Sequence, residues 1–102
     1  MYFVDQKKIE EILSYMDQIL EELASQSYNS FSEKLTLERV VHVLIESIID
    51  VGNLMIDGFI MRHPGSYEDI IDILVDEKVI PKDDENNYKS IVGLRKKLVK
   101  DY

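Results

Sequence analysis

LTLERVVHVLIESIIDVGNLMIDGFIM, residues 35–61, is the stretch that determines the fold of this chain. Apolar side chains fill most of its positions, so a helix formed by it would be apolar around most of its circumference. Its polar residues recur every three or four positions, which places them on one stripe covering roughly 80° of the helix. These residues are Arg39, His42, Glu46, Asp50, Asn53 and Asp57. We predict a long helix that its neighbours bury, with a polar stripe that faces a partner, a groove or an ion, because burying such groups unpaired is costly.

The composition limits the classes of protein to which the chain can belong. Its 102 residues suffice for one core, so residues 1–102 are expected to form a single domain. The low counts of 4 Gly and 2 Pro favour a few long helices over a turn-rich sheet. With no Cys, disulfides, thiolate metal sites and cysteine nucleophiles are excluded. A net charge of −8 lacks the overall positive field of a non-specific nucleic-acid binder, although a local basic patch lies near the C-terminus.

Neither a targeting segment nor a membrane span is expected. The opening MYFVDQKK has no positive segment followed by an apolar run, which a secretory signal requires. Glu46, Asp50 and Asp57 interrupt the apolar centre of the chain too often for a span. We therefore expect a soluble, cytoplasmic protein with no membrane partner.

Helical periodicity predicts about four helices. The first covers residues 5–25 with Asp5 as its N-cap, and the long central helix follows a polar turn, with Ser32 or Thr36 as candidate N-cap. Gly58 is expected to mark the end of the central helix, while Gly52 permits a close helix crossing. The expected fold is an all-α, up-and-down antiparallel bundle.

Two shorter helices complete the prediction. Ser66 begins a capping box, and the helix after it is expected to run to about Lys78. The apolar connector at residues 79–81 is expected to enter the core. Asp83 or Asp84 would then open a last helix that continues to the final residue.

The last helix contains an arginine where its apolar pattern predicts a leucine. Arg95 falls in the middle of a stripe formed by Tyr88, Ile91, Val92, Leu98, Val99 and Tyr102. A guanidinium cannot lose its proton and therefore needs an acceptor, so we predict that Arg95 reaches Glu46 or Asp50. Two interpretations stay open: an ion pair that serves only packing specificity, and a functional site that holds charge for a ligand or partner.

Several separated segments resemble the HepT-like family, also called YutE-like, of the HEPN superfamily. They are residues 38–39 (ER), 45–53 (IESIIDVGN), 64–67 (PGSY) and 92–95 (VGLR). The resemblance implies an all-α bundle that forms homodimers, with no cofactor. It also implies a toxin paired with an MntA-type nucleotidyltransferase antitoxin. Relatives carry further helical sequence beyond this chain's last residue, so the C-terminal part of the family domain is expected to be absent.

The family motif is an arginine, four residues, a histidine, one residue and a tyrosine. In the family, the arginine and histidine serve metal-independent RNA cleavage, and the antitoxin attaches AMP to the tyrosine. Arg95 matches the arginine and Tyr102 the tyrosine, but Lys100 replaces the histidine and Lys96 replaces a common asparagine. A histidine can accept and donate protons near neutral pH, whereas a solvated lysine stays protonated and is a poor general base.

Three functional hypotheses follow. In the first, the chain is a HepT-like interaction module with a degenerate ribonuclease motif, and Tyr102 is the AMP acceptor. In the second, it is an active endoribonuclease toxin in which Arg95 binds the scissile phosphate of RNA and Lys100 acts as a substitute acid. Arg39, Glu46, Asp50 and Asn53 form a supporting polar stripe in both hypotheses.

The third hypothesis is a carboxylate metal bundle built on the polar stripe. Its candidate ligands would be His42, Glu46, Asp50 and Asp57. Di-metal bundles use two Glu-x-x-His pairs on separate helices. Glu38 and His42 are instead four residues apart, and no second pair exists. We therefore predict no metal ligands.

Overall fold

A computed structural model describes residues 4–100 of the chain. These residues form four α-helices and one short 3-10 helix, without any β-strand. The elements in chain order are α1 (Gln6–Ser25), α2 (Phe31–Gly58), α3 (Tyr67–Asp76), η1 (Lys82–Asp84) and α4 (Glu85–Lys100). The predicted all-α bundle of about four helices is confirmed. No helix in residues 4–100 has the length and apolar character needed to cross a membrane.

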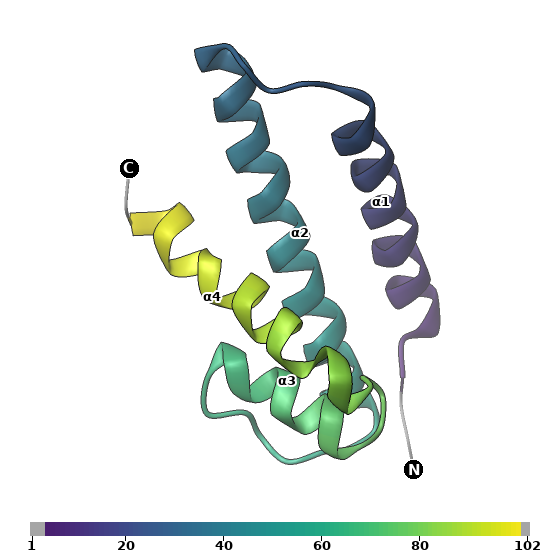
Figure 1. Ribbon diagram of the computed structural model, residues 1–102. Coiled ribbons are helices and arrows are strands. Elements are labelled where there is room, and N and C mark those ends of the chain that lie inside the picture. Colours follow the sequence, from purple (N-terminus) through teal and green to yellow (C-terminus); the bar gives the residue numbers. More distant parts are fainter. Residues whose placement is uncertain (1–3, 101–102) are drawn as a thin grey trace.

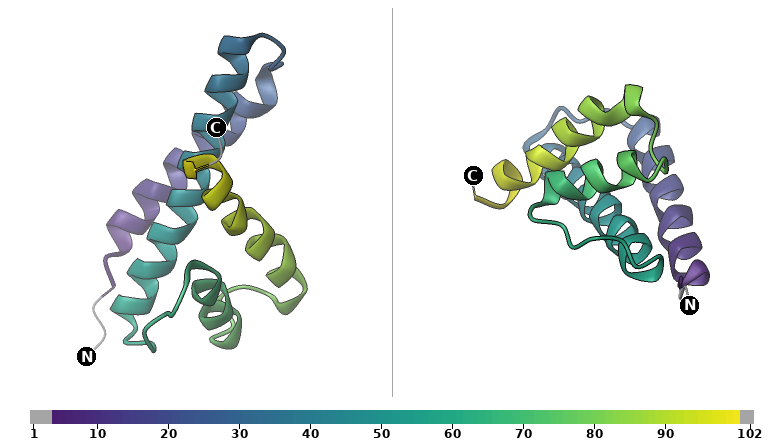
Figure 2. Two further views of the ribbon diagram at one scale, coloured as in Figure 1. Left: turned by 90° about the vertical axis from the view of Figure 1, so that its left-hand side faces the viewer. Right: turned by 90° about the horizontal axis from the view of Figure 1, so that it is seen from below.

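The long helix α2 lies at the centre of the arrangement. α1 runs antiparallel beside it, and α4 rises obliquely from its lower end toward its middle (Figure 1). Figure 2 shows α3 and α4 together on one side of α2, with α1 on another. Because α2 packs against all three other helices, it is the element that brings distant segments together.

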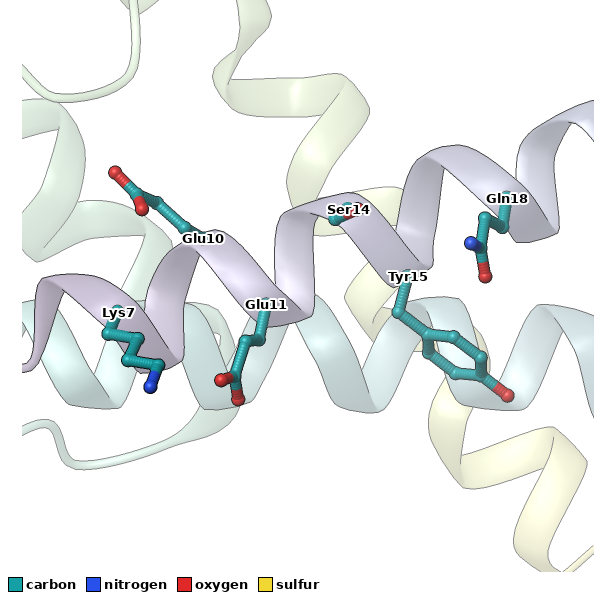
Figure 3. A pocket seen from close by; sticks show the side chains of 6 residues that line it. All are labelled: Lys7, Glu10, Glu11, Ser14, Tyr15 and Gln18. Carbon is teal, nitrogen blue, oxygen red and sulfur yellow. The ribbon is translucent and has the colours of Figure 1, made fainter.

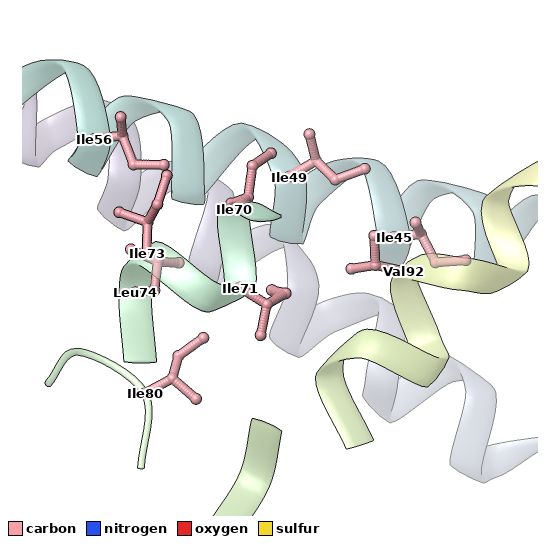
Figure 4. Packing of buried hydrophobic residues seen from close by; sticks show 9 residues of the cluster. All are labelled: Ile45, Ile49, Ile56, Ile70, Ile71, Ile73, Leu74, Ile80 and Val92. Carbon is pink, nitrogen blue, oxygen red and sulfur yellow. The ribbon is translucent and has the colours of Figure 1, made fainter. Parts of the chain in front are cut away.

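The hydrophobic core lies where α3 and α4 meet the second half of α2 (Figure 4). Its members are Ile45, Ile49, Ile56, Ile70, Ile71, Ile73, Leu74, Ile80 and Val92. The prediction that neighbours bury α2 throughout is wrong for its first half. Phe31 is 78% exposed and Leu35 is 50% exposed, because that end of α2 projects beyond α3 and α4 (Figure 1).

Gly52 permits the close crossing that the sequence predicts. A Cβ atom at this position would lie 2.5 Å from Cγ2 of Ile70 and 3.4 Å from Cδ1 of Leu74. Carbon atoms in contact normally stay about 3.5–4.0 Å apart. The glycine therefore lets α3 approach the backbone of α2.

The helix starts confirm one predicted cap and correct another. Asp5 caps α1 as predicted, since its Oδ1 accepts a hydrogen bond from the backbone N of Lys8 at 3.0 Å. The N-cap of α2 is Ser30, neither Ser32 nor Thr36. Its Oγ accepts from the backbone N of Glu33, and the Glu33 carboxylate accepts from the backbone N of Ser30. This reciprocal capping box starts the helix at Phe31, so the other two candidates lie inside it.

The remaining boundaries differ from the prediction by a few residues. Ser66 caps α3 as expected, by accepting from the backbone N of Asp69, but the helix ends at Asp76 and does not reach Lys78. Lys78 has a φ of 62°, in the left-handed region that stops a right-handed helix. Asp83 and Asp84 form η1, and α4 begins only after them.

The connector before η1 and the apolar stripe of α4 follow the prediction only in part. Ile80 is buried, whereas Val79 is 40% exposed. In the stripe Val92 is buried, but Ile91 and Val99 are exposed. The last turns of α4 extend past α3 (Figure 1). Tyr102 and the predicted continuation of the helix to the last residue lie outside the described residues.

Candidate functional site

Arg95 of α4 contacts Glu46 of α2, one of the two acceptors predicted for it. Its Nε donates a hydrogen bond to Glu46 Oε1 at 2.5 Å, whereas Asp50, one turn further along α2, is exposed. This hydrogen bond is the main cause that raises the pKa of Arg95 above its ordinary value. The two side chains remain 30% and 37% exposed, so the pair contributes at most about 1 kcal/mol to stability. Its main consequence is a fixed position for the guanidinium.

Tyr67, the first residue of α3, holds the same guanidinium from another direction. Arg95 Cζ lies 4.6 Å from the centre of the Tyr67 ring, within the range of a cation–π contact. Within residues 4–100, the hydrogen bond from Nε is the only one that the guanidinium makes. Nη1 and Nη2 can therefore donate to a ligand, in the paired geometry that suits a phosphate or carboxylate.

A hollow of about 270 Å³ lies beside Arg95, and we call it the basic hollow. It is lined by Tyr67, Glu68, Val92, Gly93, Arg95, Lys96, Val99 and Lys100. Arg95 and Lys100, the two predicted catalytic residues, thus border one space together with Lys96. Among the described residues 4–100, three cations and one carboxylate line this hollow, so the local field is positive on a chain whose net charge is −8. The hollow suits an anionic ligand.

A second hollow of about 350 Å³, which we call the loop hollow, adjoins the first. It is lined by Asn53, Pro64, Gly65, Ser66, Tyr67, Glu68 and Ile70, so the two hollows share Tyr67 and Glu68. Asn53 is half-buried and belongs to the predicted polar stripe, of which Arg39 and Asp50 are exposed. Of the four stripe residues to which the functional hypotheses give a supporting role, Glu46 contacts Arg95 and Asn53 lines the loop hollow, while the other two lie on the surface.

A clasp of hydrogen bonds fixes the loop that precedes Tyr67. Arg62 donates from Nη1 and Nη2 to the two oxygens of Asp69 at 2.7 and 2.8 Å, and Gly65 N donates to Asp69 Oδ2 at 2.9 Å. The hydrogen bonds from Arg62 have the largest effect on the Asp69 carboxylate. Together with the bond from Gly65, they hold the pKa of Asp69 well below its usual range. Because Asp69 also donates its backbone N–H to the Ser66 cap, the loop and the first turn of α3 form one unit.

His42 contacts the same carboxylate as Arg95. Its Nε2 is 3.4 Å from Glu46 Oε1, the oxygen that accepts from Arg95. The polar stripe of α2 does not by itself predict that the imidazole and the arginine share one oxygen. Asp50 and Asp57, the other two ligands of the metal-bundle hypothesis, are exposed, and residues 4–100 contain no group of three or more His, Asp or Glu side chains arranged to hold a metal ion.

A further hollow lies on the surface of α1 (Figure 3). It is lined by Lys7, Glu10, Glu11, Ser14, Tyr15 and Gln18. All six side chains come from one exposed helix face, and none belongs to the predicted site. The basic hollow, in contrast, joins residues of two different helices, α3 and α4.

Comparison with known proteins identifies the family. Residues 6–102 match the family described as "Ribonuclease HepT-like". The chain belongs to the HepT-like ribonuclease family. It is 50% identical over 103 residues to a protein of Bacillus subtilis (strain 168) named "Putative RNase YutE", and the match covers 100% of this chain and 72% of that protein. A solved structure of YutE from Bacillus subtilis, described as a cytosolic protein of unknown function, superposes with a TM-score of 0.96 at 50% identity, over 100% of this chain and 72% of that one.

In this HepT-like chain, sequence reasoning missed the part played by Tyr67. In the sequence, the tyrosine belongs to the segment at residues 64–67 that resembles the family, and no pattern there connects it with Arg95. Its contact with Arg95 joins two residues that are 28 positions apart and depends on how α3 crosses α2. The one available signal was an unusual aromatic residue at the first turn of a helix, directly after its Ser66 cap.

Proposed function

We propose that the basic hollow binds a phosphate of the RNA backbone and that Arg95 is the main phosphate ligand. The observation that carries this proposal is the position of the guanidinium. Glu46 holds its Nε, Tyr67 covers its face, and neither Nη group has a hydrogen-bond partner within residues 4–100, while Arg95, Lys96 and Lys100 line one hollow. Membership of a ribonuclease family and the name of the Bacillus subtilis relative support RNA as the source of the phosphate.

The side chains that line the hollow support slow cleavage of RNA and not fast cleavage. In metal-independent cleavage the 2′-hydroxyl attacks phosphorus, and the 5′ oxygen leaves with a proton. Lys100 borders the hollow with Arg95 and, as an ammonium group, can donate a proton to the leaving oxygen and stabilise negative charge. It is a poor acceptor for the proton of the 2′-hydroxyl, which a histidine would take. We therefore infer a site that binds RNA firmly and cleaves it slowly.

A cleavage assay with matched variants tests this proposal. Single-stranded RNA is incubated with the wild-type protein, with Lys100→His and with Arg95→Gln in the presence of EDTA. Lys100→His is expected to cleave about 100-fold faster than the wild type, at the lower end of the gain that a positioned general base provides. Arg95→Gln is expected to lose RNA binding. An Arg95→Gln variant that is folded and binds RNA as well as the wild type would refute the phosphate site.

We also propose that the chain acts as the toxin-side member of a toxin–antitoxin pair in the cytosol, as a homodimer with an MntA-type nucleotidyltransferase as partner. This second proposal is favoured by the replacement of the family histidine by Lys100, which leaves partner binding and modification as retained functions. Tyr102, two residues further on, would attack the α-phosphate of ATP with its hydroxyl oxygen, so that AMP is transferred to the tyrosine and pyrophosphate leaves. Incubation with the nucleotidyltransferase and ATP should add one AMP group, and Tyr102→Phe should abolish it. An unmodified wild-type protein under these conditions would contradict the pairing.

A further inference from the structure

The two adjoining hollows differ in charge, although they share a wall. Among residues 4–100, three cations line the basic hollow, whereas no lysine or arginine lines the loop hollow, and Glu68 belongs to the wall that the two share. An anion is therefore favoured in the first and disfavoured in the second. The loop hollow instead offers an aromatic ring, the apolar side chains of Pro64 and Ile70, and the amide of Asn53, which suit a neutral, planar, polar-edged group.

Tyr67 separates the two hollows and can serve both. It lines each of them, and Arg95 lies over its ring at 4.6 Å. The residue is nevertheless 44% exposed, so much of the ring is free for a further contact. Single-stranded RNA places a base beside every phosphate, and proteins bind such bases by stacking them on aromatic rings.

We propose that the loop hollow is a nucleobase site in which Tyr67 stacks the base next to the phosphate bound by Arg95. The inference rests on the proposed function, and it adds the substrate class, unpaired single-stranded RNA. In a duplex the base would be stacked and paired, so it could not enter the hollow.

Asn53 supplies the polar contact to the edge of the base. Its side chain makes no hydrogen bond to another residue of the described range 4–100. Asn53 belongs to α2 and lines the loop hollow from that side. An amide offers both a donor and an acceptor, as the edges of nucleobases do. The clasp between Arg62 and Asp69 keeps the opposite wall in place, so the site is formed before RNA binds.

Binding of two matched oligomers separates a base contact from a phosphate contact. Fluorescence anisotropy is measured with a 2′-O-methyl oligouridylate, which resists cleavage, and with an abasic oligomer of the same length. Tyr67→Leu is expected to weaken oligouridylate binding about tenfold and abasic binding clearly less, because Glu46 still holds the guanidinium when the ring is lost. Tyr67→Phe should bind both as the wild type does. Tyr15→Leu, on the remote exposed face of α1, is the control and should change neither.

The outcomes distinguish this inference from the function on which it rests. Equal losses on both oligomers in Tyr67→Leu would mean that the ring only positions Arg95, and this would overturn the base site. No loss on either would overturn it as well. Asn53→Ala gives an independent test should Tyr67→Leu not fold, since it should weaken only the oligouridylate. If Arg95→Gln binds both oligomers as the wild type does, the phosphate site itself has failed.

Discussion

Replacing Gly52 by alanine tests the helix crossing that positions Tyr67. The new Cβ would lie 2.5 Å from Cγ2 of Ile70, whose side chain is 2% exposed and branched at Cβ, so this methyl moves only if α3 moves. Overpacking of this kind costs about 1–3 kcal/mol. Alanine recovers about 0.5–1 kcal/mol because glycine is a poor helix former. We therefore expect Gly52→Ala to lower the free energy of unfolding by about 1–2 kcal/mol.

Gly93→Ala provides the matched control, and Ile70→Leu provides the rescue. A Cβ at Gly93 would have its nearest atom, Glu68 Oε1, at an ordinary 3.9 Å, so this variant should gain about 0.5–1 kcal/mol. Leucine lacks the Cγ2 methyl, so the cost of Gly52→Ala should be smaller in the Ile70→Leu background. Urea unfolding followed by circular dichroism measures the wild type, the three single variants and the Gly52→Ala/Ile70→Leu double variant. A Gly52→Ala variant as stable as Gly93→Ala would refute the crossing geometry.

Three further predictions concern a cap, a clasp and a charge. Ser30→Ala should lower the free energy of unfolding by about 1 kcal/mol in urea titrations, whereas Ser32→Ala should leave it nearly unchanged. Because folding lowers the pKa of Asp69 from its ordinary 3.8, its stabilisation is complete above that pH and is lost as the pH falls below it. Asp69→Asn should therefore be less stable than the wild type at pH 7 and approach it in acid, as thermal melts across pH would show; a constant difference would contradict this. Glu68→Gln removes the one carboxylate that lines the basic hollow within residues 4–100, so RNA should bind more tightly in low salt, with a smaller gain at high salt.

The sequence predicted the fold best where a single local signal, such as helical periodicity or a lone N-cap candidate, decided the structure. Helical periodicity located all four helices, and the cap at Asp5 had no rival within its own turn. Before α2, by contrast, several hydroxyl residues compete within one polar segment, and only the reciprocal pairing of Ser30 with Glu33 decides between them. The left-handed backbone conformation of Lys78 was not predictable either, since glycine is the residue that usually adopts it.

The site was predictable only in its central contact. Arg95 is a cation within an apolar pattern and therefore needs an acceptor. This sufficed to predict that it reaches Glu46 or Asp50 of the long helix, and it contacts Glu46. The choice of Glu46 over Asp50 depends on the position along α2 at which α4 crosses it. Helical periodicity does not predict this position. Tyr67 and the two hollows arise from the crossing of α3 at Gly52, so they could be found only once three helices had been placed together.

α1 differs from the other helices in having no buried residue along its 20 positions, and α2 is its main packing partner. Its amide hydrogens should consequently exchange with solvent through a sub-global opening of lower free energy than the one that exposes the centre of α2. Arg95, Glu46 and Tyr67 belong to the three helices that stay together during such an opening. The chain can thus undergo frequent fraying at its N-terminal end while the geometry around the guanidinium persists.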